Sequence, residues 1–240
     1  MPQGRYMFKL FWSFILIISL SCGSAQGSET TVNLKENTVI YHGKLSPSAN
    51  QKLLSILKSG KSKVEWLSIT SEGGEINHGM DLGDIVHDYD LKLEVNEYCL
   101  SSCANYVFSA ANHHRISSHA VIGFHGGTTG MEKEITLFID AMPEEERELT
   151  KQNLEKYMKS AVIRERNFFE KIGVDQRITT LGQSSEYKEF AEKEDFIGWY
   201  YSLEGLATLG VSNIDVVNPP WSYQHLSEKT KFFKVRVGGI

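Results

Sequence analysis

The central part of the chain alternates between short apolar runs and longer amphipathic runs, and this alternation restricts the fold more than any other feature. The amphipathic runs carry apolar residues three and four positions apart, as helices do. The expected strands are residues 64–69, 91–98 and 120–124, and the expected helices are residues 48–59, 80–89 and 102–111. Strands and helices that alternate at this spacing predict a parallel sheet with right-handed helical crossovers. We therefore expect an α/β fold of stacked βαβ units.

The regions on either side have other signatures. Residues 31–41 indicate a hairpin-like start with a turn at Glu36-Asn37, and residues 126–130 indicate a flexible break. Residues 232–237 predict an edge strand. Residues 143–172 are charged and strongly helical in composition, which predicts a long helix in the C-terminal half. Its expected buried positions are Leu149, Leu154, Tyr157, Met158, Ala161, Ile163 and Phe168.

Residues 1–25 have the features of an export signal. Arg5 and Lys9 precede an apolar run at residues 10–20, and small residues follow it. The run is well short of the roughly 20 residues that a transmembrane helix needs. Cleavage before Gln26 and lipidation of Cys22 are competing outcomes, and a retained anchor is the third. We expect an exported protein of the periplasm or envelope, either soluble or tethered to the membrane through Cys22.

The charge of the chain disfavours two classes of partner. The 240 residues carry a formal net charge of −5, and 41% of them are hydrophobic and 23% charged. Removal of residues 1–25 would take away two basic residues and no acidic ones, which changes the charge to −7. An acidic body without a long basic run argues against nucleic acid and anionic membrane surfaces as partners.

Three short polar segments stand at the ends of the expected strands. They are Ser71-Glu72-Gly73-Gly74, Cys99-Leu100-Ser101-Ser102-Cys103-Ala104 and Ile122-Gly123-Phe124-His125. Each has an ordinary interpretation, since glycine pairs make turns, serines cap helices and a lone histidine is commonly a solvated loop residue. A hydroxyl and backbone N–H groups at a helix N-terminus can also hold a nucleophile and stabilise an oxyanion. We expect the three segments to meet in space.

Two cysteines and three histidines bear on disulfide and metal chemistry. Cys99 and Cys103 are four residues apart in a chain expected to be exported, where thiols usually pair. This spacing permits a disulfide if Cys99 still belongs to the strand, and the alternative is two buried thiols. A reactive cysteine suits an oxidising compartment poorly. No metal site is expected, because no carboxylate or thiol lies at zinc-finger spacing from His113, His114 or His119.

The order of the three segments resembles the Clp protease proteolytic subunit and the wider Clp/crotonase superfamily. Residues 71–74 match the family's Ser-Pro-Gly-Gly turn, and Gly79-Met80 matches the Gly-Met that follows it. Residues 101–105 match its nucleophile motif, Ala-Ser-Met-Gly-Ala, and residues 107–111 match its Leu-Leu-Ala-Ala. The family's histidine ends a strand about as far beyond the serine as His125 lies beyond Ser102.

The resemblance covers residues 39–211, and the cysteine pair around the serine is similar to an exported branch of the superfamily. It implies a Clp/crotonase-like domain over residues 31–212 and a C-terminal extension over residues 213–240. It also implies the fold of the family, a homo-oligomer and no cofactor.

The resemblance further implies a role for four residues. Ser102 would be the nucleophile and His125 the general base. The backbone N–H groups of Gly74 and Cys103 would form the oxyanion hole.

The third catalytic member, an aspartate in the family, falls in a divergent region. Residues 201–205 are similar to the family's Ser-Ala-Pro-Glu-Ala, and counting back from them leads to Glu194 and Asp195, of which we favour Asp195. Asp175 is the other candidate. Glu72 replaces the family's proline and brings a negative charge beside the expected oxyanion site.

Three functions have to be distinguished on these grounds. The favoured one is an exported serine hydrolase, a peptidase with a peptide or protein substrate. The alternative is an inactive protein that keeps the fold to bind a peptide or partner, which Glu72 and the missing clear aspartate favour. An acyl-CoA enzyme of the crotonase kind is disfavoured, because CoA is an intracellular cofactor.

Overall fold

The structure, a computed structural model, describes residues 29–60, 63–129 and 132–238. The expected export signal and Cys22 lie outside this part of the chain. Among the residues that the structure describes, no helix is both long and apolar enough to cross a membrane.

Most of the strands form one six-stranded sheet in the order β1-β2-β3-β4-β6-β9. The first two strands make the expected antiparallel hairpin, with Glu36 in the left-handed region (φ 57°), and all the other pairs are parallel. The predicted parallel sheet is therefore confirmed. The strands are β1 Thr31–Lys35, β2 Thr38–His42, β3 Trp66–Thr70, β4 Lys92–Val95, β6 His114–Ser117 and β9 Ile214–Val217.

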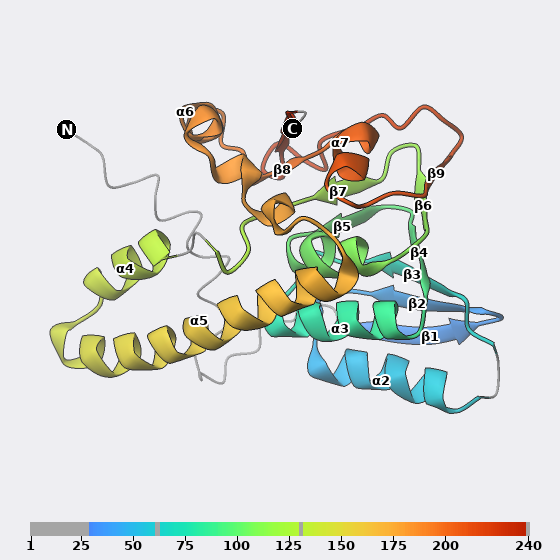
Figure 1. Ribbon diagram of the computed structural model, residues 1–240, viewed down its shortest axis with the longest axis horizontal. Helices are drawn as coiled ribbons and strands as arrows, with labels where there is room; N and C mark the ends of the chain where they lie inside the picture. Colours follow the sequence, from blue (N-terminus) through green and yellow to red (C-terminus); the bar gives the residue numbers. More distant parts are fainter. Residues whose placement is uncertain (1–28, 61–62, 130–131, 239–240) are drawn as a thin grey trace.

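Helices pack beside this sheet, as Figure 1 shows. The first half of helix α5 extends past the body of the fold, where α4 lies next to it, and its second half runs along α3. The long α5 confirms the helix predicted for the C-terminal half. The α-helices are α2 Pro47–Lys58, α3 Ile76–Asp88, α4 Glu132–Asp140, α5 Glu144–Ile172, α6 Ser185–Lys193 and α7 Leu203–Thr208. The π-helix η1 spans Cys103–Phe108, and the 3₁₀ helices are η2 Gln176–Thr179 and η3 Leu181–Gln183.

Two small sheets lie next to each other at one end of the main sheet. Strand β5 (Tyr98–Leu100) pairs in parallel with β7 (Val121–Gly123), and β8 (Gly198–Tyr200) pairs in parallel with β10 (Phe232–Lys234). The backbones of Phe124 and Trp199 exchange two hydrogen bonds of 2.7 and 2.9 Å. These bonds join the segment after β7 to β8, so residues far apart in sequence meet beside β5.

Several expected elements differ in detail. Ser46 caps α2, through a 3.3 Å bond from the Ala49 N–H, in place of Ser48. The cap lies two residues earlier because Pro47 is well suited to the first turn of a helix. The single strand expected at residues 91–98 is divided between β4 and β5, which belong to different sheets.

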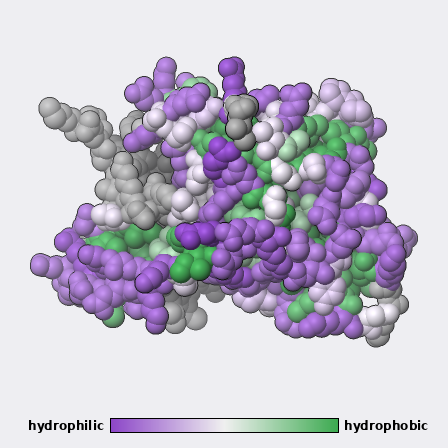
Figure 2. Space-filling model, viewed as in Figure 1, coloured by the Kyte–Doolittle hydropathy of each residue, from purple (hydrophilic) through white to green (hydrophobic). Residues whose placement is uncertain are grey.

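The burial predicted for the long C-terminal helix is wrong at two positions of α5. Leu149 is 67% exposed and Ile163 is 49% exposed. Leu149 lies in the half of α5 that extends past the body of the fold, and hydrophilic side chains cover much of this helix (Figures 1 and 2). Ile163 is two residues from Ala161 and from Glu165, both of which are buried, so it lies on the opposite side of the helix.

The break expected at residues 126–130 begins in closely packed structure. A Cβ at Gly126 would lie 2.5 Å from Gln183 Nε2, and one at Gly127 would collide with the Glu165 carboxylate. These glycines therefore provide room for neighbouring side chains. The expected domain boundary at residue 212 falls just before β9, which is the last strand of the main sheet.

Candidate active site

The three polar segments meet around β5, as expected from the sequence. The Ser71 N–H donates to the Tyr98 carbonyl at 3.1 Å, and the Leu100 N–H donates to the Ser71 carbonyl at 2.9 Å. On the other side, the Ser101 N–H donates to the Gly123 carbonyl at 2.8 Å. The segment that carries Ser102 is thus held between the other two by backbone hydrogen bonds.

A tight backbone arrangement presents Ser102. Ser101, just before it, has a left-handed backbone (φ 53°), and Gly73 has φ 97°. A Cβ at Gly73 would lie 2.6 Å from the Leu100 carbonyl oxygen and 2.9 Å from the Ser102 nitrogen. Only glycine allows the turn to come this close to the start of η1.

The Ser102 hydroxyl lies against this turn. Its Oγ donates a 2.8 Å hydrogen bond to the Gly74 carbonyl, and the residue is only 4% exposed. Ser102 precedes the first residue of η1, Cys103, and its side chain makes no capping bond to the helix. The ordinary interpretation of Ser102 as a helix cap is therefore not what the structure shows.

His125 is fastened to the same helix as Ser102. The Asn105 side chain donates to the His125 carbonyl at 2.6 Å and accepts from the His125 N–H at 3.5 Å. The imidazole Nδ1 is shielded from solvent, and burial lowers the pKa of His125 below its usual value. The neutral imidazole that results is the form that can take a proton from a hydroxyl.

Cys99 and Cys103 form a disulfide, with Cα atoms 5.2 Å apart. Both cysteines are fully buried. The bridge ties β5 to the first residue of η1, on either side of Ser101 and Ser102. The disulfide was one of the two alternatives left open by the sequence, and the structure confirms it over two free thiols.

The three candidate acids lie in different surroundings. The Asp175 carboxylate accepts from Arg177 at 2.6 and 2.8 Å and from the Arg177 backbone N–H at 2.9 Å. The Arg177 side chain holds the pKa of Asp175 below its usual value. Glu194 and Asp195 are exposed in the turn after α6, where Asp195 has φ 53°. The fourth residue named for its charge, Glu72, is exposed too.

Two residues near the site were missed by reasoning from sequence. Asn105 falls in the nucleophile motif but has no role of its own in it, and Glu165 is not among the buried positions expected for residues 143–172. Glu165 is 0% exposed, and it is four residues after Ala161 and three before Phe168. That spacing places it on the buried face of α5, which is the signal that could have identified it.

The Glu165 carboxylate accepts hydrogen bonds from three separate elements. The Tyr106 hydroxyl of η1 donates at 2.6 Å, and Gln176 of η2 donates at 3.0 Å. Thr128, three residues after His125, donates from its backbone N–H at 3.1 Å and from its hydroxyl. Burial and the Glu165 charge raise the pKa of Tyr106 well above its usual value, so its hydroxyl remains a donor.

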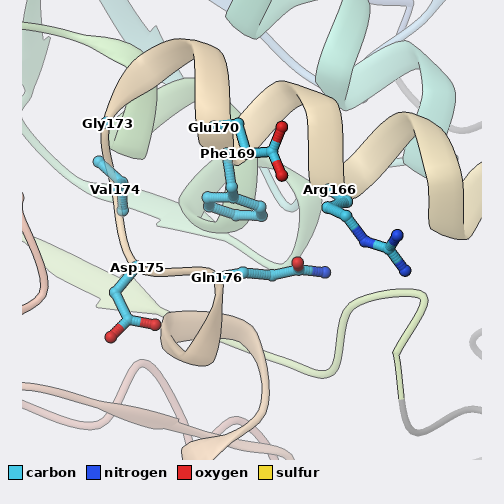
Figure 3. Close-up of a pocket in the computed structure, with 7 residues that line it drawn as sticks. All are labelled: Arg166, Phe169, Glu170, Gly173, Val174, Asp175 and Gln176. Carbon is cyan, nitrogen blue, oxygen red and sulfur yellow. The ribbon is translucent and has the colours of Figure 1, made fainter.

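A shallow cavity of about 380 Å³ lies near the end of α5. Figure 3 shows that the Gln176 side chain extends away from Asp175 and toward the side on which Arg166 lies. Neither Ser102 nor His125 lines this cavity, whose residues are Arg166, Phe169, Glu170, Gly173, Val174, Asp175 and Gln176. In the described part of the chain, no group of three or more His, Cys, Asp or Glu side chains is placed to hold a metal ion.

Comparison with known proteins finds similarity in structure only. No family model matches the chain, and no curated protein matches it. The ClpP protease catalytic domain from Plasmodium falciparum is similar over 76% of this chain and 86% of its own, with 14% identity and a TM-score of 0.40. An enoyl-CoA hydratase from Thermoplasma volcanium is similar over 40% of this chain, with 10% identity and a TM-score of 0.30. That match spans about half (51%) of the hydratase chain.

Proposed function

We propose that this chain is a serine hydrolase that acts as a peptidase, with Ser102 as the nucleophile and His125 as the general base. The observation that carries the proposal is the joint placement of these two residues. Ser102 stands at the start of η1 against the glycine turn, and Asn105 of the same helix holds the backbone of His125. A hydroxyl, a neutral imidazole and the N–H groups of a turn and a helix start are the parts that acyl transfer needs.

The reaction begins when the Ser102 hydroxyl turns from the Gly74 carbonyl toward His125. Oγ attacks the carbonyl carbon of the substrate, and its proton passes to the imidazole. The π electrons of the carbonyl move to its oxygen, where the backbone N–H groups of Gly74 and Cys103 stabilise the negative charge. Collapse of this intermediate breaks the C–N bond, and the amine leaves with the proton from the imidazolium. Water then attacks the acyl-enzyme by the same route and releases the acid.

Asp195 is the proposed orienting acid, with Glu194 and Asp175 as alternatives. Such an acid fixes the tautomer of the histidine and stabilises the imidazolium. Among the three, Asp175 is the one whose carboxylate is already bonded to Arg177. We accordingly rank it behind the two residues of the turn.

An inactive peptide-binding protein is the second candidate, and one observation favours it. The Ser102 hydroxyl has a good acceptor in the Gly74 carbonyl and is almost fully buried. A serine held in this way fits a purely structural role, in which its hydroxyl fastens the glycine turn to η1. On this alternative, the turn and the neighbouring strand would bind an extended peptide without cleaving it.

Export and assembly complete the proposal. The buried disulfide supports an oxidising compartment, which fits the expected periplasm or envelope and leaves a lipid tether at Cys22 as one form of the mature protein. We also propose a homo-oligomer, which is what the sequence resemblance implies.

Labelling with a fluorophosphonate tests the chemistry directly. The unmodified protein should be labelled at Ser102 and should hydrolyse peptides or activated esters, and Ser102→Ala should abolish both. Ser101→Gly is the matched control, since it removes the adjacent hydroxyl while glycine readily adopts the left-handed backbone of Ser101. This control should still be labelled at Ser102.

Two results would contradict the proposal. Equal residual hydrolysis by the unmodified protein and Ser102→Ala would show that Ser102 is structural, and the binding protein would then be the better explanation. Loss of labelling in Ser101→Gly, with the label on residue 101 in the unmodified protein, would move the nucleophile by one position.

A further inference from the structure

We propose that the buried carboxylate of Glu165 is the positioning residue that sets where His125 stands relative to Ser102. The inference rests on the proposed function, since it is for proton transfer from Ser102 that the place of His125 matters. Glu165 belongs to α5, a helix that the sequence resemblance connects with none of the catalytic roles.

The carboxylate joins the Ser102 helix to the loop that follows His125. Its Oε1 accepts from the Tyr106 hydroxyl at 2.6 Å and from the Thr128 backbone N–H at 3.1 Å. Tyr106 lies four residues after Ser102, and Thr128 lies three residues after His125. A single oxygen atom therefore connects η1, which begins beside the proposed nucleophile, with the segment that follows the proposed general base.

The second oxygen fixes the same loop from another direction. Oε2 accepts from the Thr128 hydroxyl, from the Thr129 N–H at 3.4 Å and from Gln176 at 3.0 Å. All of these partners are donors, which suits a carboxylate that accepts at both oxygens. Because Thr128 is bonded to both oxygens, the loop cannot move without breaking contact with the carboxylate.

Two adjacent residues of η1 thus hold the two ends of one short segment. Asn105 holds the His125 end directly, through the 2.6 Å bond to its carbonyl. Tyr106 holds the Thr128 end through Glu165. With one of these two connections removed, the segment would keep the backbone bonds of Phe124 with Trp199 and of Gly127 with Thr179, but it would lose one of its two links to η1.

The packing between them shows that the carboxylate has no spare room. Gly127 lies between the two held ends, and a Cβ at this position would collide with Glu165 Oε1 and lie 2.7 Å from the Thr179 hydroxyl. The loop therefore passes directly over the carboxylate. A change at Glu165 should displace the loop directly, because the carboxylate contacts the loop backbone itself.

Glu165→Gln tests this with little change in volume. At either oxygen position the amide nitrogen would face a backbone N–H, that of Thr128 or that of Thr129, which cannot accept, so the loop must shift or lose a bond. A misplacement of about 1 Å can cost on the order of 10²-fold in rate, and we expect a loss of this size in the rate at which fluorophosphonate labels Ser102. Glu170→Gln, an exposed acid on the same helix, is the matched control and should be labelled at the unmodified rate.

A double-mutant cycle with His125→Ala separates positioning from a purely structural role. If Glu165 acts through His125, Glu165→Gln should not slow the residual labelling of His125→Ala any further. If the carboxylate had a merely structural role, Glu165→Gln would lower the labelling rate by a similar factor in both backgrounds. Equal factors in the two backgrounds, or labelling of Glu165→Gln at the unmodified rate, would overturn the inference.

An NMR measurement keeps the inference testable without activity. The imidazole resonances of His125 and their titration should move in Glu165→Gln and stay in place in Glu170→Gln. If the unmodified protein is not labelled at all, the proposed function fails, and the NMR result alone decides about Glu165. Unmoved His125 resonances would then overturn the inference.

Tyr106→Phe is the second variant if Glu165→Gln does not fold. It removes one hydroxyl from the same oxygen and keeps the aromatic ring in its packing against Phe168. The labelling rate should fall less than in Glu165→Gln, and the His125 resonances should move in the same direction. An unmodified labelling rate together with unmoved resonances would count against the inference.

Discussion

His125, the proposed general base, shows at the scale of one residue how burial favours a neutral imidazole. Water stabilises the charged imidazolium, and its exclusion therefore lowers the pKa of His125. The same exclusion strengthens hydrogen bonds to the segment, such as the 2.6 Å bond from Asn105. The hydrogen bonds between Asn105 and the His125 backbone hold the residue, while burial favours the neutral ring.

The pH dependence of labelling should show this shift. A histidine in water has a pKa of about 6.5, and a lowered value keeps the ring neutral to more acidic pH. We expect the rate of Ser102 labelling to stay constant as pH falls through about 6.5 and to decline only below that. The measurement is the labelling rate against pH, with circular dichroism at each pH to exclude unfolding. A midpoint above the usual histidine value would contradict the shift.

The disulfide acts at the scale of elements, because it joins a strand to a helix. Cys99 is the middle residue of β5, and Cys103 is the first residue of η1. The loop that they close is short, and the bridge therefore removes little entropy from the unfolded chain. Its main effect is on the angle at which η1 leaves β5, and so on the place of the Ser102 hydroxyl.

Reduction of the disulfide should therefore slow the labelling of Ser102 strongly and lower the free energy of unfolding only slightly. We expect a reductant to slow Ser102 labelling at least tenfold while it lowers the free energy of unfolding by less than about 3 kcal/mol, the value for a 15-residue loop. The double variant Cys99→Ala/Cys103→Ala is the control, since the reductant should leave its labelling rate unchanged. Equal labelling before and after confirmed reduction would show that the bridge does not position Ser102.

Individual elements also show how far the sequence determines this fold. The strand–helix alternation predicts the parallel sheet, because hydrophobic periodicity is a local property. The meeting of Ser71, Leu100 and Gly123 followed from strand ends that share one edge. Glu165 was missed because its partners are distant in sequence, and a charged residue on a charged helix looks exposed. Strand β6 was missed because it is short and begins with His114, which is polar although it is fully buried.

At the scale of the whole molecule, the C-terminal residues lie against the strand that leads to the candidate site. Strand β10 lies within the C-terminal extension expected from residue 213, and it pairs with β8, which is joined to the segment after β7. Phe232 of β10 is 3% exposed, and its ring lies directly against Gly123. The end of the chain thereby covers the strand that leads to His125.

Gly123→Ala should destabilise the fold through this contact. The new methyl group would lie 2.5 Å from the Phe232 ring, and overpacking of this kind costs about 1–3 kcal/mol. Urea unfolding gives the loss, and Gly238→Ala, where a Cβ meets no atom within 4 Å, should show almost none. In Gly123→Ala/Phe232→Leu the loss should be smaller than the sum of the two single losses. Strict additivity would show that the two positions do not interact.

The contact between Gly127 and Glu165 has a consequence for how such a chain can diverge. A side chain at position 127 would require both the Glu165 carboxylate and the Thr179 hydroxyl to move aside, since a Cβ there would collide with the first and lie 2.7 Å from the second. A substitution at residue 127 should therefore cost more while residues 165 and 179 keep their present side chains than after both have been shortened. Among related chains, we expect these three positions to vary together, with glycine at 127 wherever the carboxylate is kept.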